Sequence, residues 1–217
     1  IKFSNKEINS ISKKINRNLK RSIDIAYSRI RKFHLKQKIS SFRFKDKFKN
    51  ELSYRYSPIE SVGVYVPGGT ASYPSTVLMN CIPALVAGVR NIYLTTPALG
   101  TPVNPAIIYA AKKCGVKEIY KTGGPHSIAA LTYGTKTFKK VDKIVGPGNR
   151  FVTYAKKEVF GEVGIDMIAG PSEVSIVADK HSNPEWIASD LIAQAEHDLN
   201  NAVRWLERAL TDYDSID

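Results

Sequence analysis

The sequence predicts an α/β protein. We expect a Rossmann-like parallel sheet with helices on both faces, preceded by a helical N-terminal arm and followed by the start of an incomplete second lobe. From residue 62 onward, short runs rich in β-branched residues alternate with longer helical patterns. Three of the first four strand-like runs end in Gly/Pro clusters, at residues 67–69, 123–125 and 146–148. Serial strand–loop–helix units imply a parallel sheet with ligands at the carboxyl ends of its strands.

Three segments follow from this pattern. Residues 1–57 form a basic helical arm, residues 58–172 the Rossmann-like α/β domain, and residues 173–217 the start of a second lobe with a divergent C-terminal tail.

The arm has one apolar stripe. Between residues 4 and 38, apolar side chains recur every three or four positions, as on one face of a helix. They are Ile8, Ile11, Ile15, Leu19, Ile23, Ala26, Ile30 and Phe33. The stripe is too narrow for a core of its own, so we expect it to pack on the main body or on another subunit. Residues 42–56 fit either two short edge strands or an extended connection.

The remaining elements are assigned by period and by their Gly, Pro and Asn boundaries. The predicted strands are residues 62–66, 91–95, 116–121, 141–145, 165–168 and 174–178. The predicted helices are residues 75–88, 104–114, 127–133, 151–160 and 184–197.

The stretch at residues 62–69 is the first candidate ligand loop. Three alternating valines form a strand that ends at Pro67, and Gly68 and Gly69 leave room for a ligand to approach. A strand, a glycine turn and a helix together point helix N–H groups at an anion. The spacing is not G-x-G-x-x-G, so the dinucleotide fingerprint is absent. From this stretch alone, a ligand loop and a plain tight turn both remain open.

Gln194 and His197 lie three residues apart on a predicted helix and therefore share a face. Such a pair can bind a metal through an amide oxygen and a ring nitrogen, but a catalytic zinc normally takes three protein ligands. Spacing alone favours a helix end with solvated polar residues.

Charge is unevenly distributed. Residues 1–57 hold 17 Lys and Arg against four acids, whereas residues 58–217 hold 15 basic residues and 16 acids. A basic arm can bind nucleic acid, but this one lacks a nucleic-acid motif, which disfavours that partner. The sequence has no apolar run of about 20 residues and no signal-peptide pattern. With only two cysteines, both in apolar helical patterns, we expect a cytoplasmic protein with reduced thiols and no membrane association.

Five longer strings, considered together, are more specific than any single loop. They are GVYVPGG at 63–69, YPSTVLMN at 73–80, VDKIVGPGN at 141–149, GEVGIDMIAGPSE at 161–173 and SDLIAQAEHD at 189–198. In this order they resemble the histidinol dehydrogenase family over residues 25–198.

The resemblance implies a function. The family oxidises L-histidinol to L-histidine in histidine biosynthesis, with NAD as hydride acceptor and a zinc ion that positions the substrate, and full-length members form homodimers. On this basis Tyr65 and Asn149 are expected to contact NAD, and Ser172 the substrate. Gln194 and His197 are expected to bind zinc and to border the substrate, which replaces the solvated-end interpretation.

One matched position departs from the family pattern. The family has Gly-Gly-Ala-Gln where this chain has Gly123, Gly124, Pro125 and His126. The family glutamine contacts NAD, and a histidine can still form hydrogen bonds. We therefore keep His126 as an expected NAD contact and expect a changed cofactor affinity.

The resemblance also leaves a gap. The family's catalytic Glu-His pair and its further zinc ligands lie beyond the end of this sequence, so no catalytic residue is assigned, and residues 199–217 do not resemble the family. We therefore expect the chain to be inactive alone. A non-catalytic truncated remnant of the enzyme is the main alternative. A basic-arm nucleic-acid-binding module is another, and it predicts affinity that falls steeply with salt.

Overall fold

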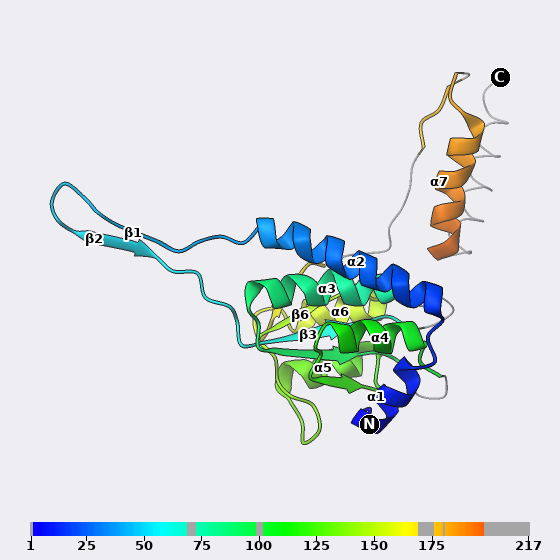
Figure 1. Ribbon diagram of the computed structural model, residues 1–217, viewed down its shortest axis with the longest axis horizontal. Coiled ribbons are helices and arrows are strands. Elements are labelled where there is room, and N and C mark those ends of the chain that lie inside the picture. Colours follow the sequence, from blue (N-terminus) through cyan, green and yellow to red (C-terminus); the bar gives the residue numbers. More distant parts are fainter. Residues whose placement is uncertain (1, 69–72, 99–101, 169–175, 180, 198–217) are drawn as a thin grey trace. The chain divides into compact units, whose positions relative to one another are not determined.

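The computed structural model describes residues 2–68, 73–98, 102–168, 176–179 and 181–197. The chain divides into two compact units, residues 1–170 and 171–217. The first unit contains a five-stranded parallel sheet with strand order β5-β4-β3-β6-β7 (Figure 1). The predicted α/β class with a parallel sheet is therefore confirmed.

The sheet begins at a buried central strand, β3, Ser61–Tyr65. It pairs with β4, Asn91–Thr95, on one side and with β6, Lys143–Val145, on the other. The outer strands are β5, Glu118–Tyr120, and β7, Gly164–Ile165. Three predicted strands were too long: 116–121 and 141–145 each keep only three residues, and 165–168 keeps only its first, with Gly164 added.

Four helices cover the sheet, two on each face. On one face, α3, Pro74–Ala87, packs on α4, Pro105–Lys113. On the other, α5, Gly124–Tyr133, packs on α6, Arg150–Glu158. Two separate clusters of buried apolar side chains fill the two interfaces, because alternate residues of each strand point to opposite faces.

The arm adds a further layer outside α3 and α4. It forms two helices rather than one, α1 at Asn5–Ser12 and α2 at Arg17–Lys36. The chain breaks between them because Asn16 caps α2, with its side chain accepting from the Asn18 N–H. Helix α1 packs on α4, and α2 packs on α3 (Figure 1). Of the two possibilities that the sequence left open for the arm, the main body or another subunit, packing on the main body is the one observed.

Two ion pairs add to the narrow apolar stripe in holding the arm on the α/β body. The Glu7 carboxylate pairs with Lys121 at 2.5 Å, and the hydrogen bond from Lys121 lowers the pKa of Glu7 to about 2. The Asp24 carboxylate pairs with Lys113, also at 2.5 Å. Two of the arm's four acids therefore neutralise lysines of the α/β body.

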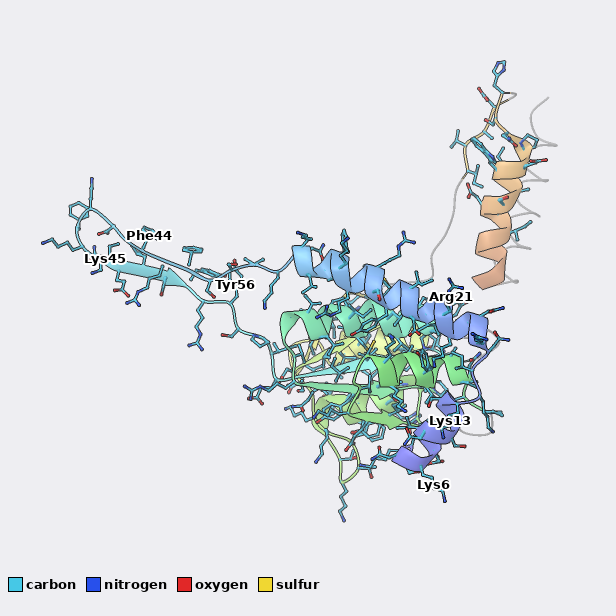
Figure 2. The ribbon with its side chains drawn as sticks, in the orientation of Figure 1. Lys6, Lys13, Arg21, Phe44, Lys45 and Tyr56 are labelled. Carbon is cyan, nitrogen blue, oxygen red and sulfur yellow. The ribbon has the colours of Figure 1, made fainter. Side chains whose placement is uncertain are left out.

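Residues 42–54 form an antiparallel hairpin that projects from the sheet, β1 at Phe42–Lys45 and β2 at Glu51–Tyr54 (Figure 1). Of the two possibilities left open by the sequence, the strand pair is thus the one observed. Asp46 closes the turn by accepting the Phe48 and Asn50 N–H groups. Figure 2 shows Phe44 and Lys45 on this hairpin, where both side chains are exposed.

Cys81 and Cys114 are free, buried and adjacent. Their hydrogen bond, together with burial, raises the pKa of the Cys81 thiol well above its ordinary value. The prediction that both thiols are packed in the protein is confirmed.

The second unit contains α7, Pro184–His197, with the predicted bounds. The predicted strand at 174–178 is not observed in residues 176–178, and residues 174 and 175 lie outside the described residues. Within the described chain, no helix has both the length and the apolar character needed to cross a membrane.

Candidate functional site

The strand order creates a natural ligand crevice. After β3 the chain turns to one face of the sheet through α3, and after β6 it turns to the other face through α6. The loops after two neighbouring strands therefore diverge at the carboxyl edge between β3 and β6. In open α/β sheets, ligands bind at such a switch point.

A cavity of about 290 Å³ lies at this edge. Its lining comes from the ends of three strands and from the residue that precedes α6: Tyr65, Pro67, Gly68, Pro97, Ala98, Lys121, Gly123, Gly124 and Asn149. Small-molecule sites range from about 300 to 1,000 Å³. The volume of this cavity therefore suits one part of a dinucleotide. Two of the predicted NAD contacts, Tyr65 and Asn149, meet in this cavity.

Tyr65 ends β3 with its ring buried and its hydroxyl at the cavity. The hydroxyl oxygen accepts the Gly124 N–H at 3.2 Å, which leaves the hydroxyl proton free to be donated to a ligand. Burial raises the pKa of Tyr65, so the phenol stays protonated at neutral pH. Gly124 has φ +68°, a conformation that residues with a Cβ rarely adopt.

The glycine loop after β6 is held by an ion pair between a buried lysine and a partly exposed aspartate. The Lys156 ammonium, on α6, contacts the Asp166 carboxylate and donates to the Gly146 carbonyl at 3.1 Å. The other carboxylate oxygen of Asp166 accepts the Gly146 N–H at 2.8 Å. Both polar groups of Gly146 are therefore fixed. A Cβ on Gly146 would overlap the Tyr65 carbonyl, so the two loops meet only because this residue is glycine.

Asn149 is exposed and serves as the N-cap of α6. Its side-chain oxygen accepts the N–H groups of Phe151 at 3.1 Å and Val152 at 3.2 Å. Because capping uses the oxygen, the amide nitrogen is the group that Asn149 presents to a ligand.

His126 does not line the described cavity. Helix α5 begins at Gly124, three residues earlier than predicted, which places His126 in the first turn, where it is exposed. Pro125 lies in the same turn, where a missing N–H costs the helix little.

The structure does not describe the side chains of the other expected site residues, so their roles stay predictions. Ser172 lies outside the described residues. Gln194 and His197 occupy the last turn of α7 in the second unit, and their side chains also lie outside the described part. Among the described residues, no group of three or more metal-ligating side chains occurs.

Some residues at this edge were not predicted from the sequence. Lys121 and Pro97 line the cavity, and Lys156 and Asp166 hold its rim. A local signal existed only for Asp166, which lies within a matched string. Lys156 looks like any surface helix lysine, although it is buried.

Three comparisons with known proteins agree on one family. A sequence model described as histidinol dehydrogenase matches residues 1–212, a wider span than the five matched strings. The expectation that the chain does not resemble the family after residue 198 is therefore wrong for residues 199–212. Curated relatives named histidinol dehydrogenase include those of Pelagibacter ubique and Mesorhizobium japonicum. The first is 62% identical over 89% of this chain and 45% of its own length; the second is 56% identical over 82% of this chain and 42% of its own length.

A crystal structure of histidinol dehydrogenase from Elizabethkingia anophelis superposes with a TM-score of 0.83 at 46% identity. It covers 91% of this chain and 46% of that chain. The present chain thus spans less than half of the length of these relatives. A match this broad and this similar leads to one conclusion: the chain belongs to the histidinol dehydrogenase family, which is a family of oxidoreductases.

Proposed function

We propose that this chain supplies the NAD-binding part of a histidinol dehydrogenase, which oxidises L-histidinol to L-histidine with the help of zinc. The observation that carries the proposal is the cavity at the β3–β6 edge, where Tyr65 and Asn149 meet. Both are residues that the resemblance to the family predicts to contact NAD.

The described residues fit a dinucleotide in three ways. The cavity lies at the switch point of a sheet with Rossmann strand order. Gly68 and Gly123 lie so close to Pro97 that a Cβ on either would crowd the proline ring. Without side chains, these two glycines leave space in the cavity that they line. Lys121 also lines the cavity, where its ammonium would bind a phosphate in exchange for the Glu7 carboxylate with which it is paired.

NAD, when bound, would supply the hydride acceptor. The chain's own residues would bind and orient it. The protonated Tyr65 hydroxyl would donate a hydrogen bond, and the Asn149 amide nitrogen would donate another. The Lys156–Asp166 pair would keep the loop before Asn149 in one conformation.

The donor set of α7 fits part of a zinc site. Gln194 and His197 would supply an oxygen and a nitrogen ligand from one helical face, and both would border the substrate. Ser172 would contact the substrate, and His126 would remain near the cofactor through the first turn of α5. Zinc would polarise and position L-histidinol.

The 217 residues alone are proposed to be inactive. The sequence contains one Glu-His dipeptide, Glu196 and His197, and His197 is already proposed as a zinc ligand. No residue is therefore left for the family's proton-transfer pair. By the same resemblance, we propose a cytoplasmic homodimer for the complete enzyme.

NAD titration by calorimetry tests the cofactor site. The unmodified chain should bind NAD, and Tyr65→Phe should weaken binding about fivefold, the value of one neutral hydrogen bond. Tyr133→Phe, an exposed tyrosine on α5 outside the cavity, is the matched control and should change nothing. Asn149→Asp keeps the cap but loses the amide donor, so it should weaken NAD binding at least as much as Tyr65→Phe.

Absence of NAD binding by a folded chain would contradict the proposal and favour a non-catalytic remnant. Turnover of histidinol by the 217 residues with NAD and zinc would contradict the proposed inactivity. A nucleic-acid-binding module is not favoured, because the family match includes the whole basic arm.

A further inference from the structure

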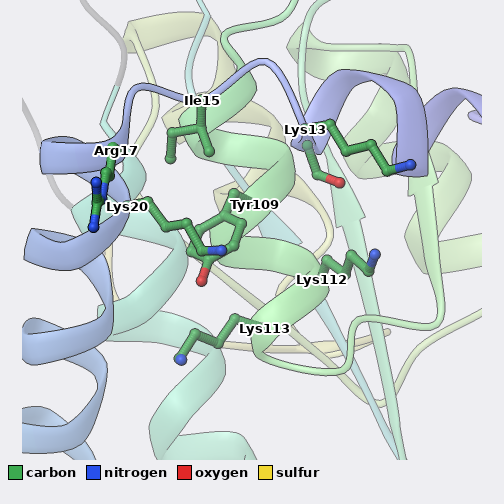
Figure 3. A pocket seen from close by; sticks show the side chains of 8 residues that line it. Lys13, Ile15, Arg17, Lys20, Tyr109, Lys112 and Lys113 are labelled. Atoms are coloured by element: carbon green, nitrogen blue, oxygen red, sulfur yellow. The ribbon is translucent and has the colours of Figure 1, made fainter.

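A second cavity, of about 570 Å³, lies between the arm and the α/β body (Figure 3). Five cationic side chains line it: Lys13, Arg17, Lys20, Lys112 and Lys113. They come from the end of α1, the first turn of α2 and the last turn of α4. Figure 3 shows them around the ring of Tyr109. This cavity shares no lining residue with the one at Tyr65.

The two cavities lie at opposite rims of the sheet. A helix that connects two parallel strands runs antiparallel to them, so the last turn of α4 lies toward the amino ends of the strands. The cavity at Tyr65 lies at their carboxyl ends. A ligand of the basic cavity would therefore be separate from the proposed NAD.

The positive charge of the cavity is poorly compensated. Among described residues, Lys13, Arg17 and Lys20 form no ion pair with any carboxylate. Lys112 donates to the neutral Asn9 side chain at 2.7 Å. Lys113 alone is paired, with Asp24, and that carboxylate also accepts the Tyr109 hydroxyl at 2.7 Å. Four of the five cations therefore form no ion pair with a carboxylate in the described chain, although the charge of Lys20 helps to lower the pKa of Asp24 and its ammonium lies over the Tyr109 ring.

The helix termini add to this imbalance. The first turn of α2 carries Arg17 and Lys20 and no acidic residue, so positive side chains lie at the positive end of the helix dipole. Such an arrangement is unfavourable unless an anion is bound between the charges. Lys112 and Lys113, at the negative end of α4, are compensated in part by that helix.

We propose that this cavity binds a small molecule that carries two or more phosphate groups. The charged residues surround one cavity from three helix ends instead of forming a line along the surface, which suits a compact polyanion better than a nucleic-acid strand. The cavity volume is within the range of small-molecule sites and larger than a single phosphate needs. Lys13, Arg17 and Lys20, which lack a carboxylate, are the expected phosphate contacts.

Inorganic pyrophosphate is the probe, titrated calorimetrically into the 217-residue chain at low and at physiological ionic strength. The test variant is Lys13→Gln with Lys20→Gln. The matched control is Lys14→Gln with Lys32→Gln, because it also removes one charge beside Lys13 and one from α2, outside the cavity lining. Circular dichroism and thermal unfolding are to be measured first, to check that both variants fold.

Saturable binding at one site is expected, weakened on the order of tenfold or more in the test variant and less than about twofold in the control. The test variant should bind NAD as the unmodified chain does, which separates this proposal from the proposed function. Equal weakening in both variants would mean general charge attraction and overturn the proposal, as would the absence of saturable binding. Pyrophosphate binding that Asn149→Asp weakens and the test variant does not would place the anion in the other cavity. Binding only by oligonucleotides, with affinity rising with length, would favour nucleic acid instead.

Discussion

The ion pair between Lys156 and Asp166 offers the sharpest test of how the cofactor loop is held. The Lys156 side chain is 5% exposed and the Asp166 side chain 30%. Asp166→Asn would leave a buried ammonium with no carboxylate partner, only neutral oxygen acceptors such as the Gly146 carbonyl. Removing one member of a buried pair costs about 3–5 kcal/mol. Because water reaches Asp166, we expect about 3 kcal/mol, a large share of the stability of a typical domain.

Urea unfolding followed by circular dichroism measures this cost. With a slope of about 2 kcal/mol/M, the midpoint should fall by about 1–2 M. Glu158→Gln is the control, because Glu158 is an exposed acid on the same helix as Lys156 and should leave the midpoint unchanged. The affinity for NAD should also fall in Asp166→Asn when it is measured without urea, where the variant is folded. The reason is that Gly146 and Asn149 are then held less firmly.

A second variant keeps the test decisive. Lys156→Met with Asp166→Asn removes the buried charge together with its partner, while the asparagine oxygen can still accept the Gly146 N–H. Stability should return to within about 1 kcal/mol of the unmodified chain. The reasoning is refuted if Asp166→Asn alone costs less than about 1 kcal/mol, or if the double variant is as unstable as the single one.

Three further results are expected. Gly124→Ala should destabilise the chain by about 1–2 kcal/mol in urea unfolding, because φ +68° is costly for alanine; an unchanged midpoint would contradict this. The hydrogen bond from Lys113 lowers the pKa of Asp24, so Asp24 stabilises the fold above its unfolded pKa of about 3.9, and this contribution is lost as pH falls. Asp24→Asn should thus cost up to about 1 kcal/mol at pH 7 and less at pH 3, and an equal cost at both would argue against the ion pair. Cys81 and Cys114 should resist a water-soluble thiol reagent in the native state and react after unfolding, and fast native labelling would show that the pair is not buried.

The local sequence determined which segments form helices and strands. The period of the apolar residues distinguishes the two, and boundary residues such as Asn16, Asn149 and Gly88 act within one turn of the backbone. For that reason 91–95 and 184–197 match the structure at both ends. The long matched strings determined the family in the same way, because they are read directly from neighbouring residues.

Contacts between distant residues were decided only by the tertiary structure. The sequence implied a parallel sheet but not which strand neighbours β3, and that order places the crevice. The hydrogen bonds of Asp142 to Ser61 join residues 81 positions apart, and no local pattern indicates such a pairing.

The burial of Lys156 and the basic cavity also depend on contacts between distant residues. A lysine on a helix is normally solvated, and this one is buried because Asp166 and Gly146 come to it from the ends of two other segments. The arm's charges likewise form no local motif, and only the packing of α1 and α2 against α4 gathers five of the chain's cations around one cavity. The sequence alone therefore determined the elements and the family. Only the fold decided where charge is concentrated, because charge density depends on distances through space that chain order does not specify.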